Sequence, residues 1–183
     1  MNLIRKSLAA ALTLAATLAV SAGGAVVGSA SGDVAIVADD GTQVSAAANA
    51  AVTAGDSVTT GADSRADVLL GGAARVSLGA QTQVRFVSLD PGARELLIAG
   101  GTVDVRTYGG DAPRLATPSM TIRPNVPGTY RVTVSGDGQT SVSVGSGSAT
   151  IVTPAGSSTL EAGRSIVART SCNSGRFAVQ LHA

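Results

Sequence analysis

Short runs of alternating apolar and polar residues fill the chain from Asp33 onward, and Gly, Asp, Ser or Pro interrupts them every 8 to 12 residues or so. In the segment 74–78, for example, Val76 points to one side of an extended chain, and Arg75 and Ser77 point to the other. A period of two indicates a strand with one buried and one solvated face. Many such strands at regular spacing are typical of an all-β sandwich or roll.

The same alternation recurs in three further segments of the chain. They are Val103 and Val105 against Asp104 and Arg106, then Tyr130, Val132 and Val134 against Arg131 and Thr133, and finally Phe177, Val179 and Leu181 against Ala178, Gln180 and His182. After the N-terminal segment, no stretch of about ten residues keeps a helical period without an interrupting Gly or Pro. We therefore expect a chain of strands and turns.

The interruptions carry turn chemistry of their own. The segments 39–41 (Asp-Asp-Gly), 136–138 (Gly-Asp-Gly) and 145–147 (Gly-Ser-Gly) supply residues that tolerate a positive φ. The Thr-Pro steps at 117–118 and 153–154 force extended conformations at strand ends. These signals predict frequent tight turns between the strands.

Length and composition define the size and kind of core. The 183 residues suit one domain, and 44% of them are apolar, whereas aromatic residues make up 2% and Trp is absent. Such a core has to be built from Val, Leu, Ile and Ala, which pack well on pleated surfaces. The predicted fold class is therefore all-β, a single domain of many short strands arranged as a two-sheet sandwich or β-roll.

The N-terminus has the pattern of a secretory signal peptide. Arg5 and Lys6 precede an uncharged segment, 7–20, that is rich in Leu and Ala, and small residues follow up to Ala22. We expect a signal peptide over residues 1–22 and a mature domain over 23–183 with a C-terminal strand extension. This predicts a periplasmic or secreted protein without a membrane span after cleavage. An uncleaved anchor is the alternative.

Charge and rare residues narrow the possible functions. The formal net charge is +1 and basic residues are scattered singly, so no nucleic-acid partner is expected. Cys172 is the only cysteine, which excludes an internal disulfide and leaves pairing with a second chain open. The only histidine is His182, next to the last residue, where chains usually fray.

No constellation of residues predicts catalysis. A Cys172–His182 dyad is formally possible but has no pocket around it, and no Lys follows the leader to pair with a serine. Asp56, Asp63 and Asp67 lack the spacing of a calcium loop, and one Cys with one His does not make a zinc site. We expect no enzyme activity, no cofactor and no metal.

The two tyrosines differ in their expected placement. Tyr130 lies on the apolar side of its strand, which predicts core packing. Tyr108 precedes two glycines and is the better candidate for a surface platform that stacks on a sugar.

Several sequence segments together resemble a known family. They span residues 55–70, 94–107, 116–151 and 160–168, and the positions that match the family's pattern are Gly55, Asp56, Thr60, Gly61, Gly128, Thr129, Tyr130 and Gly163. In this order they resemble the FecR domain, the periplasmic module of bacterial regulators of iron-citrate uptake. The similarity covers roughly Ala25 to Ala168. Segments 71–74 and 125–127 depart from the family's usual turns.

The resemblance implies an envelope-facing domain that acts by contact with other proteins. Because only a few residues precede Lys6, the resemblance does not extend to the cytoplasmic anti-sigma segment, and a stand-alone exported domain is expected. Two functional hypotheses follow. One is a protein-interaction module that serves as a scaffold or sensor in the cell envelope. The other is a module that binds envelope polysaccharide or peptidoglycan through surfaces rich in Ser, Thr and Arg.

Overall fold

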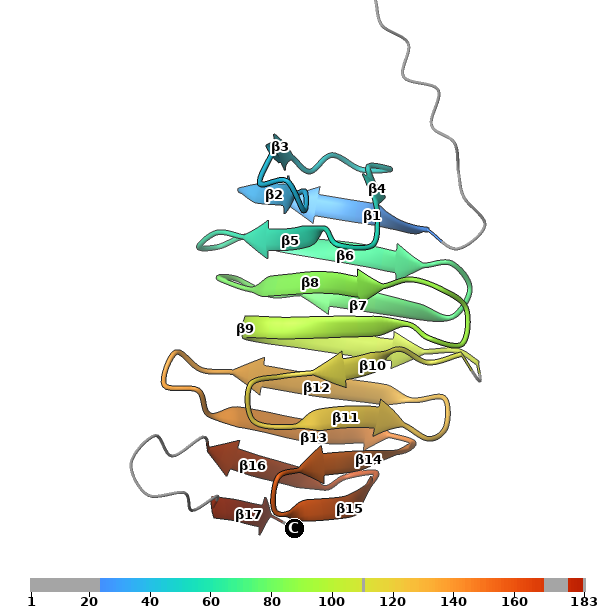
Figure 1. The fold of residues 1–183 in the computed structure, drawn as a ribbon, viewed down its shortest axis with the longest axis vertical. Helices are drawn as coiled ribbons and strands as arrows, with labels where there is room; N and C mark the ends of the chain where they lie inside the picture. The colour runs from blue at the N-terminus through green and yellow to red at the C-terminus, as the bar shows by residue number, and fades with distance from the viewer. Residues whose placement is uncertain (1–23, 110, 170–177, 183) are drawn as a thin grey trace, which may run out of the picture.

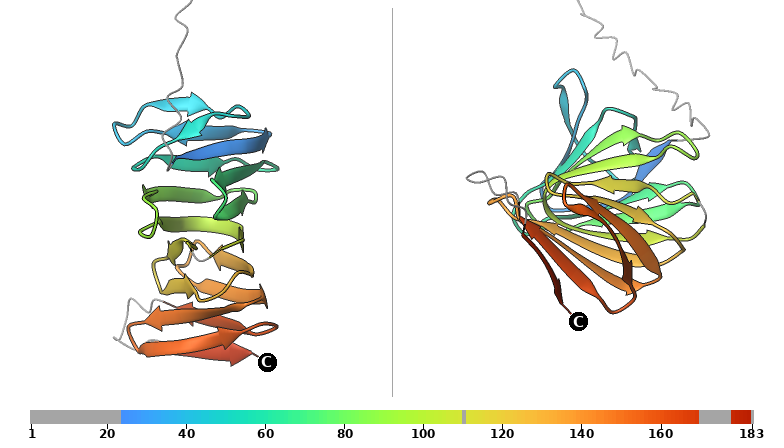
Figure 2. Two further views of the ribbon diagram at one scale, coloured as in Figure 1. Left: turned by 90° about the vertical axis from the view of Figure 1, so that its right-hand side faces the viewer. Right: turned by 60° about the horizontal axis from the view of Figure 1, so that its bottom comes forward.

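The structure is a computed structural model that describes residues 24–109 and 111–169, together with the backbone of residues 178–182. All regular elements in this part of the chain are β-strands, 17 in number. Figures 1 and 2 show them stacked along the long axis of the molecule, with β1 near one end and β17 near the other. The described residues include no helix long and apolar enough to cross a membrane.

The strands form two sheets that share the long strand β9 (Glu95–Thr107). The first sheet has the order β4 (Ala51–Val52), β1 (Ala25–Ser31), β6 (Arg65–Leu70), β7 (Ala74–Leu78), β9, β12 (Thr129–Val134), β13 (Thr140–Ser146), β16 (Ser165–Arg169) and β17 (Ala178–His182). The second has the order β3 (Gln43–Ser45), β2 (Val34–Val37), β5 (Ser57–Thr60), β8 (Gln83–Ser88), β9, β10 (Arg114–Ala116), β11 (Thr121–Pro124), β14 (Ser148–Thr153) and β15 (Gly156–Glu161).

Strand β9 passes from one sheet to the other at its two glycines. Its first half pairs with β8 and β10 in the second sheet, and its second half pairs with β7 and β12 in the first. Gly101 has a φ of +90°, and a Cβ at this position would lie 2.5 Å from Cα of Thr82. Only glycine combines this conformation with so close an approach, and the strand can therefore bend here.

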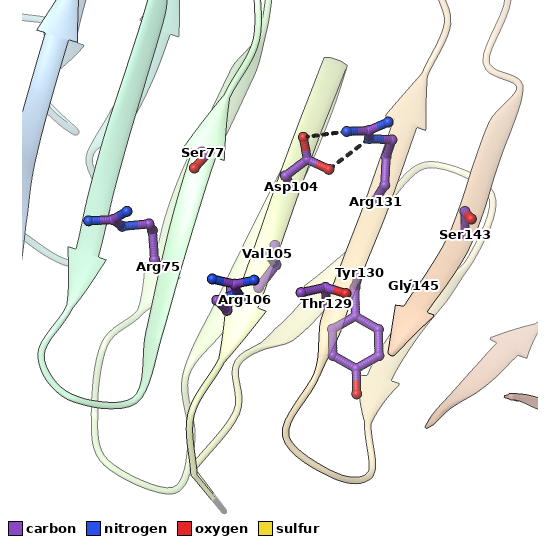
Figure 3. Close-up of a pocket in the computed structure, with 10 residues that line it drawn as sticks. All are labelled: Arg75, Ser77, Asp104, Val105, Arg106, Thr129, Tyr130, Arg131, Ser143 and Gly145. Carbon is purple, nitrogen blue, oxygen red and sulfur yellow. Dashed lines mark hydrogen bonds and ion pairs between the residues drawn. The ribbon is translucent and has the colours of Figure 1, made fainter. Parts of the chain in front are cut away.

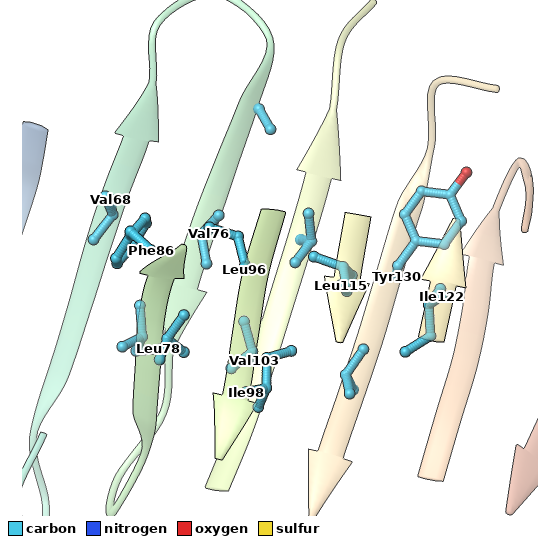
Figure 4. Packing of buried hydrophobic residues seen from close by; sticks show 14 of the residues in the cluster. Val68, Val76, Leu78, Phe86, Leu96, Ile98, Val103, Leu115, Ile122 and Tyr130 are labelled. Atoms are coloured by element: carbon cyan, nitrogen blue, oxygen red, sulfur yellow. The ribbon is translucent and has the colours of Figure 1, made fainter. Parts of the chain in front are cut away.

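The core lies between the two sheets and forms one continuous cluster. Figure 4 shows inward side chains of both sheets packed together, among them Val76 and Val103 from the first sheet and Phe86 and Ile98 from the second. Most of the buried residues are aliphatic, and Tyr130 and Phe86 are the largest fully buried side chains of the described residues. The interior therefore has the aliphatic character that the composition predicts.

The predicted alternation is confirmed in the middle of the chain. Val76, Val105 and Val132 are buried, whereas Arg75 and Arg131 on the same strands are exposed. The prediction of an all-β chain of many short strands is confirmed as well. The sandwich and the roll, offered as alternatives, coincide in this molecule, because two facing sheets are joined by a strand that runs through both.

The turn predicted at residues 145–147 contains fewer residues than expected. Gly145 and Ser146 still belong to β13, and Gly147 alone, with a φ of +85°, separates β13 from β14. Since β13 lies in the first sheet and β14 in the second, this single residue takes the chain across the edge of the stack.

Several sequence predictions fall outside the described residues. These are the signal peptide over 1–22, Cys172 and Phe177. At the C-terminal end the backbone of β17 pairs with β16, with Ser165 opposite His182.

Candidate ligand-binding face of the first sheet

The eight residues that match the family pattern lie at turns and at the edges where the chain crosses between sheets. Asp56 closes the turn between β4 and β5: its carboxylate Oδ2 accepts hydrogen bonds from the backbone N–H and the hydroxyl of Thr53, both at 2.8 Å. Gly55 has a φ of +95°, and a Cβ there would lie 3.2 Å from Cβ of Asp39. This pair thus shapes a turn against the hairpin of β2 and β3.

Thr60 and Gly61 belong to a column of polar contacts along one edge of the stack. The hydroxyl of Thr60 donates to the carbonyl of Gly79 at 2.6 Å and accepts from the backbone N–H of Thr82 at 2.9 Å. In turn the hydroxyl of Thr82 accepts from the N–H of Thr102 at 3.0 Å. Buried backbone groups need such partners because they have lost water. These hydroxyl groups therefore provide hydrogen-bond partners for backbone groups where the chain crosses between the sheets.

Gly128, Thr129 and Tyr130 build a corner at the other edge. A Cβ on Gly128 would lie 2.8 Å from the carbonyl carbon of Ser146 and closer still to its oxygen. The hydroxyl of Tyr130 reaches the carbonyls of Val126 at 2.6 Å and of Ser148 at 3.0 Å. Burial raises the pKa of Tyr130, so its hydroxyl is a donor across the physiological range. The corner depends on the absence of a side chain at 128 and on this hydroxyl.

Gly163 lies in the turn between β15 and β16 with a φ of +78°, and its N–H donates to the carbonyl of Val144 at 2.7 Å. The family-pattern residues therefore hold turns and edges at different levels of the stack. The structure does not bring all eight together into one site.

Of the three aspartates considered for metal binding, Asp56 and Asp67 are engaged in local contacts, and Asp63 lies in the turn between β5 and β6. The turn residue Asp40 is engaged locally as well. Asp40 accepts from the N–H of Thr42 at 2.8 Å, which lowers the pKa of this exposed carboxyl group. Asp67 accepts from the hydroxyls of Ser29 and Ser77 on the outer face of the first sheet, whereas Asp56 lies in the turn that leads into β5 of the second sheet. Among the described residues no group of three or more His, Cys, Asp or Glu side chains is arranged to hold a metal ion.

The outward side chains of the first sheet form ordered rows across its strands. One row contains Ser77, Asp104, Arg131 and Ser143, which lie directly opposite one another on β7, β9, β12 and β13. The next row contains Arg75, Arg106 and Thr129. Figure 3 shows these residues around a shallow depression on the outer surface. We call the surface formed by these two rows the arginine face.

The first of these rows holds a closed ion pair. Nε of Arg131 donates to Oδ1 of Asp104 at 2.7 Å, and Nη2 donates to Oδ2 at 3.1 Å. This bidentate contact raises the pKa of Arg131, because the hydrogen bonds and the carboxylate charge favour the guanidinium form.

The positive charges of the second row are not paired with a carboxylate of the described residues. Arg75 and Arg106 lie directly opposite each other on adjacent strands, both are exposed, and neither forms an ion pair within the described residues. Like charges in this position repel each other. Tyr108 follows Arg106 by two residues, its N–H donates to the carbonyl of Ala73 beside β7, and it is 54% exposed.

Sequence reasoning placed Tyr108 on the surface and missed the arginine pair. Alternation alone indicates that Arg75 and Arg106 point outward. No signal in the sequence says that β7 and β9 are neighbours, or that Arg75 and Arg106, 31 residues apart in the chain, are in register.

The fold and these surfaces define the class of protein as an all-β domain with an aliphatic core between two sheets and solvated outer faces. The sequence profile of the family described as FecR protein matches residues 56–150, just over half of the chain. The chain belongs to the FecR family.

Two solved structures share the fold of this chain. Two crystal structures of a candidate anti-sigma factor from Parabacteroides distasonis, at 2.50 and 1.65 Å resolution, superpose with a TM-score of 0.57 at 16% sequence identity. The similarity covers 68% of this chain and 58% of that protein, so it extends over little more than half of the other chain. No curated protein matches the sequence.

Proposed function

We propose that this chain is an exported, non-enzymatic interaction module that acts as a scaffold or sensor in the bacterial cell envelope, through contact with another protein. Its membership of the FecR family carries the proposal, because FecR-type regulators work through protein contacts. The signal-peptide pattern of residues 1–22 supports the location.

The arrangement of polar groups supports a binding role over a catalytic one. The buried hydroxyls of Thr60 and Thr82 and the carboxylate of Asp56 are engaged with the backbone of turns and edges. The outer faces, in contrast, present long rows of solvated side chains on a rigid sheet. A rigid surface with ordered side chains suits recognition, because little conformational entropy is lost on binding.

Site-specific photo-crosslinking in cells tests this proposal. A photoreactive residue replaces Ser143 on the outer side of the first sheet or, in a matched variant, Arg123 on the outer side of the second. We expect a recurrent envelope protein in stoichiometric yield from one face and not from the other. The N-terminal residue of the captured chain is determined in the same sample, and we expect a start at Gly23.

Two results would count against the proposal in different ways. A captured chain that still begins at Met1 would remove the cleaved leader and leave an anchored protein. Absence of any recurrent adduct from both positions, in cells that express the protein at its natural level, would refute a stable protein partner on either face.

A further inference from the structure

The arginine face carries positive charge that the described part of the protein does not neutralise. Arg75 and Arg106 are directly opposed across β7 and β9. Side chains in this relation have Cβ atoms about 4.5 to 5.5 Å apart, and two like charges there destabilise the sheet. Figure 3 shows both arginines side by side on adjacent strands, with Thr129 next to Arg106.

The carboxylates of the same face are already occupied. Asp104 binds Arg131 through both of its oxygens. Asp67 accepts hydrogen bonds from Ser29 and Ser77 through one oxygen each. Within the described residues, therefore, neither carboxylate of this face forms an ion pair with Arg75 or Arg106. An anion from outside the domain would relieve their repulsion.

The surroundings of the arginines have the chemistry of a sugar site. The depression is lined by the hydroxyl groups of Ser77, Thr129 and Ser143 and by the backbone of Gly145. The exposed ring of Tyr108 lies at the end of the strand that carries Arg106. Hydroxyl groups match the hydroxyls of a saccharide, an aromatic ring stacks on its apolar face, and guanidinium groups bind carboxylate or phosphate oxygens in a bidentate manner.

The depression favours a saccharide over the apolar centre of a protein interface. The centres of stable protein interfaces are apolar, and aromatic residues and arginines anchor them where they are fully desolvated. This depression is lined by exposed and half-buried Arg, Asp, Ser, Thr and Gly residues above the buried Val105 and Tyr130. Of the exposed large apolar residues in the described structure, Val44 and Val87 belong to the second sheet, and none lines the depression.

We propose that the arginine face binds an acidic polysaccharide, with Arg75 and Arg106 holding its carboxylate or phosphate groups and Tyr108 contacting its sugar rings. This proposal names a ligand for the sensor role and in this respect rests on the proposed function. Its charged groups, Arg75 and Arg106, lie outside the family pattern, which contributes Thr129 to the lining.

Binding of oligogalacturonate to the purified protein, measured by calorimetry, tests the proposal. We expect saturable binding that weakens by about tenfold or more in the variant Arg75→Ala/Arg106→Ala, because charge-assisted hydrogen bonds are lost. The matched control Arg114→Ala/Arg123→Ala removes the same charge from the outer side of the second sheet and should bind normally. Methyl-esterified oligogalacturonate, which keeps the sugar but loses the charge, should bind about tenfold more weakly.

Further ligands distinguish the source of the anion. Sulfated or phosphorylated oligosaccharides that bind more tightly than oligogalacturonate identify a phosphate-type group, and the reverse order identifies a uronate. Poly-L-glutamate carries carboxylates without sugar rings. We expect Tyr108→Ala to weaken binding of oligogalacturonate and to leave that of poly-L-glutamate unchanged.

Three outcomes would overturn the proposal. They are equal binding by the wild type and the Arg75→Ala/Arg106→Ala variant, an equal loss in the control variant, and poly-L-glutamate binding as tight as that of the saccharide with no effect of Tyr108→Ala. The last result would assign the face to an acidic protein segment.

The proposed protein contact and the proposed saccharide site can be refuted independently of each other. If crosslinking captures a protein partner while no saccharide binds, the saccharide site is refuted and the proposed function stands. If the saccharide binds as expected while no protein adduct forms, the saccharide site stands and the protein contact of the proposed function is refuted.

Discussion

At the edges of the stack, glycines and polar side chains make contacts that hold the fold together, whereas two charged side chains of the arginine face have no partner in the described structure. Gly128 lies against the backbone of Ser146, and the hydroxyl of Tyr130 is bound to the carbonyls of Val126 and Ser148. Arg75 and Arg106, by contrast, lie in solvent without an ion pair in the described structure. The family pattern follows the edges, so it identifies how the chain folds and leaves out Arg75, Arg106 and Tyr108, which we assign to binding.

The outer side of the second sheet sharpens this contrast. There Arg85 pairs with Asp39, and Arg114 lies 3.8 Å from Glu95. Exposed pairs of this kind contribute little to stability, but they cancel charge. Arg123 on the neighbouring strand forms no ion pair in the described structure, but Glu95 lies beside Arg114 there, whereas no carboxylate pairs with either Arg75 or Arg106.

The largest effect is expected for Gly128→Ala. The added Cβ would collide with the carbonyl group of Ser146, which is backbone and cannot rotate away. We expect the free energy of unfolding to fall by about 3 kcal/mol or more, measured by urea denaturation. Gly136→Ala is the matched control, because no atom lies within 4 Å of its added Cβ. Equal stability of the two variants would show that the edge is not constrained as described.

Tyr130→Phe should have the next largest effect. It removes the hydroxyl that serves two carbonyls at the corner while keeping the buried ring. We expect a loss of about 1 to 2 kcal/mol in the free energy of unfolding. Tyr108→Phe, on the exposed side, should leave the urea midpoint unchanged. A Tyr130→Phe variant as stable as the wild type would contradict the role of the corner.

Alkaline pH probes the same hydroxyl without a change of side chain volume. Burial raises the pKa of Tyr130 above its ordinary value of 10.0, so the folded state favours the protonated phenol. The resulting stability is fully present below the unfolded pKa and is lost as the pH rises through the folded one. Urea midpoints between about pH 8 and pH 11 should therefore fall more steeply for the wild type than for Tyr130→Phe. Parallel curves would refute the assignment.

The smallest effects are expected on the arginine face. Arg75→Thr removes one of two opposed like charges, and we expect the free energy of unfolding to stay the same or to rise by about 0.5 kcal/mol, more at low salt than at high salt. Arg131→Thr breaks the pair with Asp104 and should lower it by about 0.2 to 1 kcal/mol. A destabilising Arg75→Thr would indicate that this arginine supports the fold and is not held ready for a ligand.

The sequence by itself determined the strand character, the aliphatic core and the inward or outward direction of individual side chains. These properties are local: alternation at Val103 and Val105 or at Tyr130 and Val132 repeats every two residues and needs no knowledge of a partner strand. The turn residues Asp40 and Gly41 are local in the same way, since the carboxylate of Asp40 binds Thr42, two residues on.

Only the tertiary structure decided which strands are neighbours and in what register. Placing Arg75 opposite Arg106 and Asp104 opposite Arg131 depends on pairing across 31 and 27 residues of chain, and a shift by one residue would turn these side chains to the other face. The close approach of Gly128 to Ser146 likewise arises from two crossings of the chain at one edge. Local preferences select the strands, but the burial of one shared core selects the register, and the register places two arginines without counter-charges side by side.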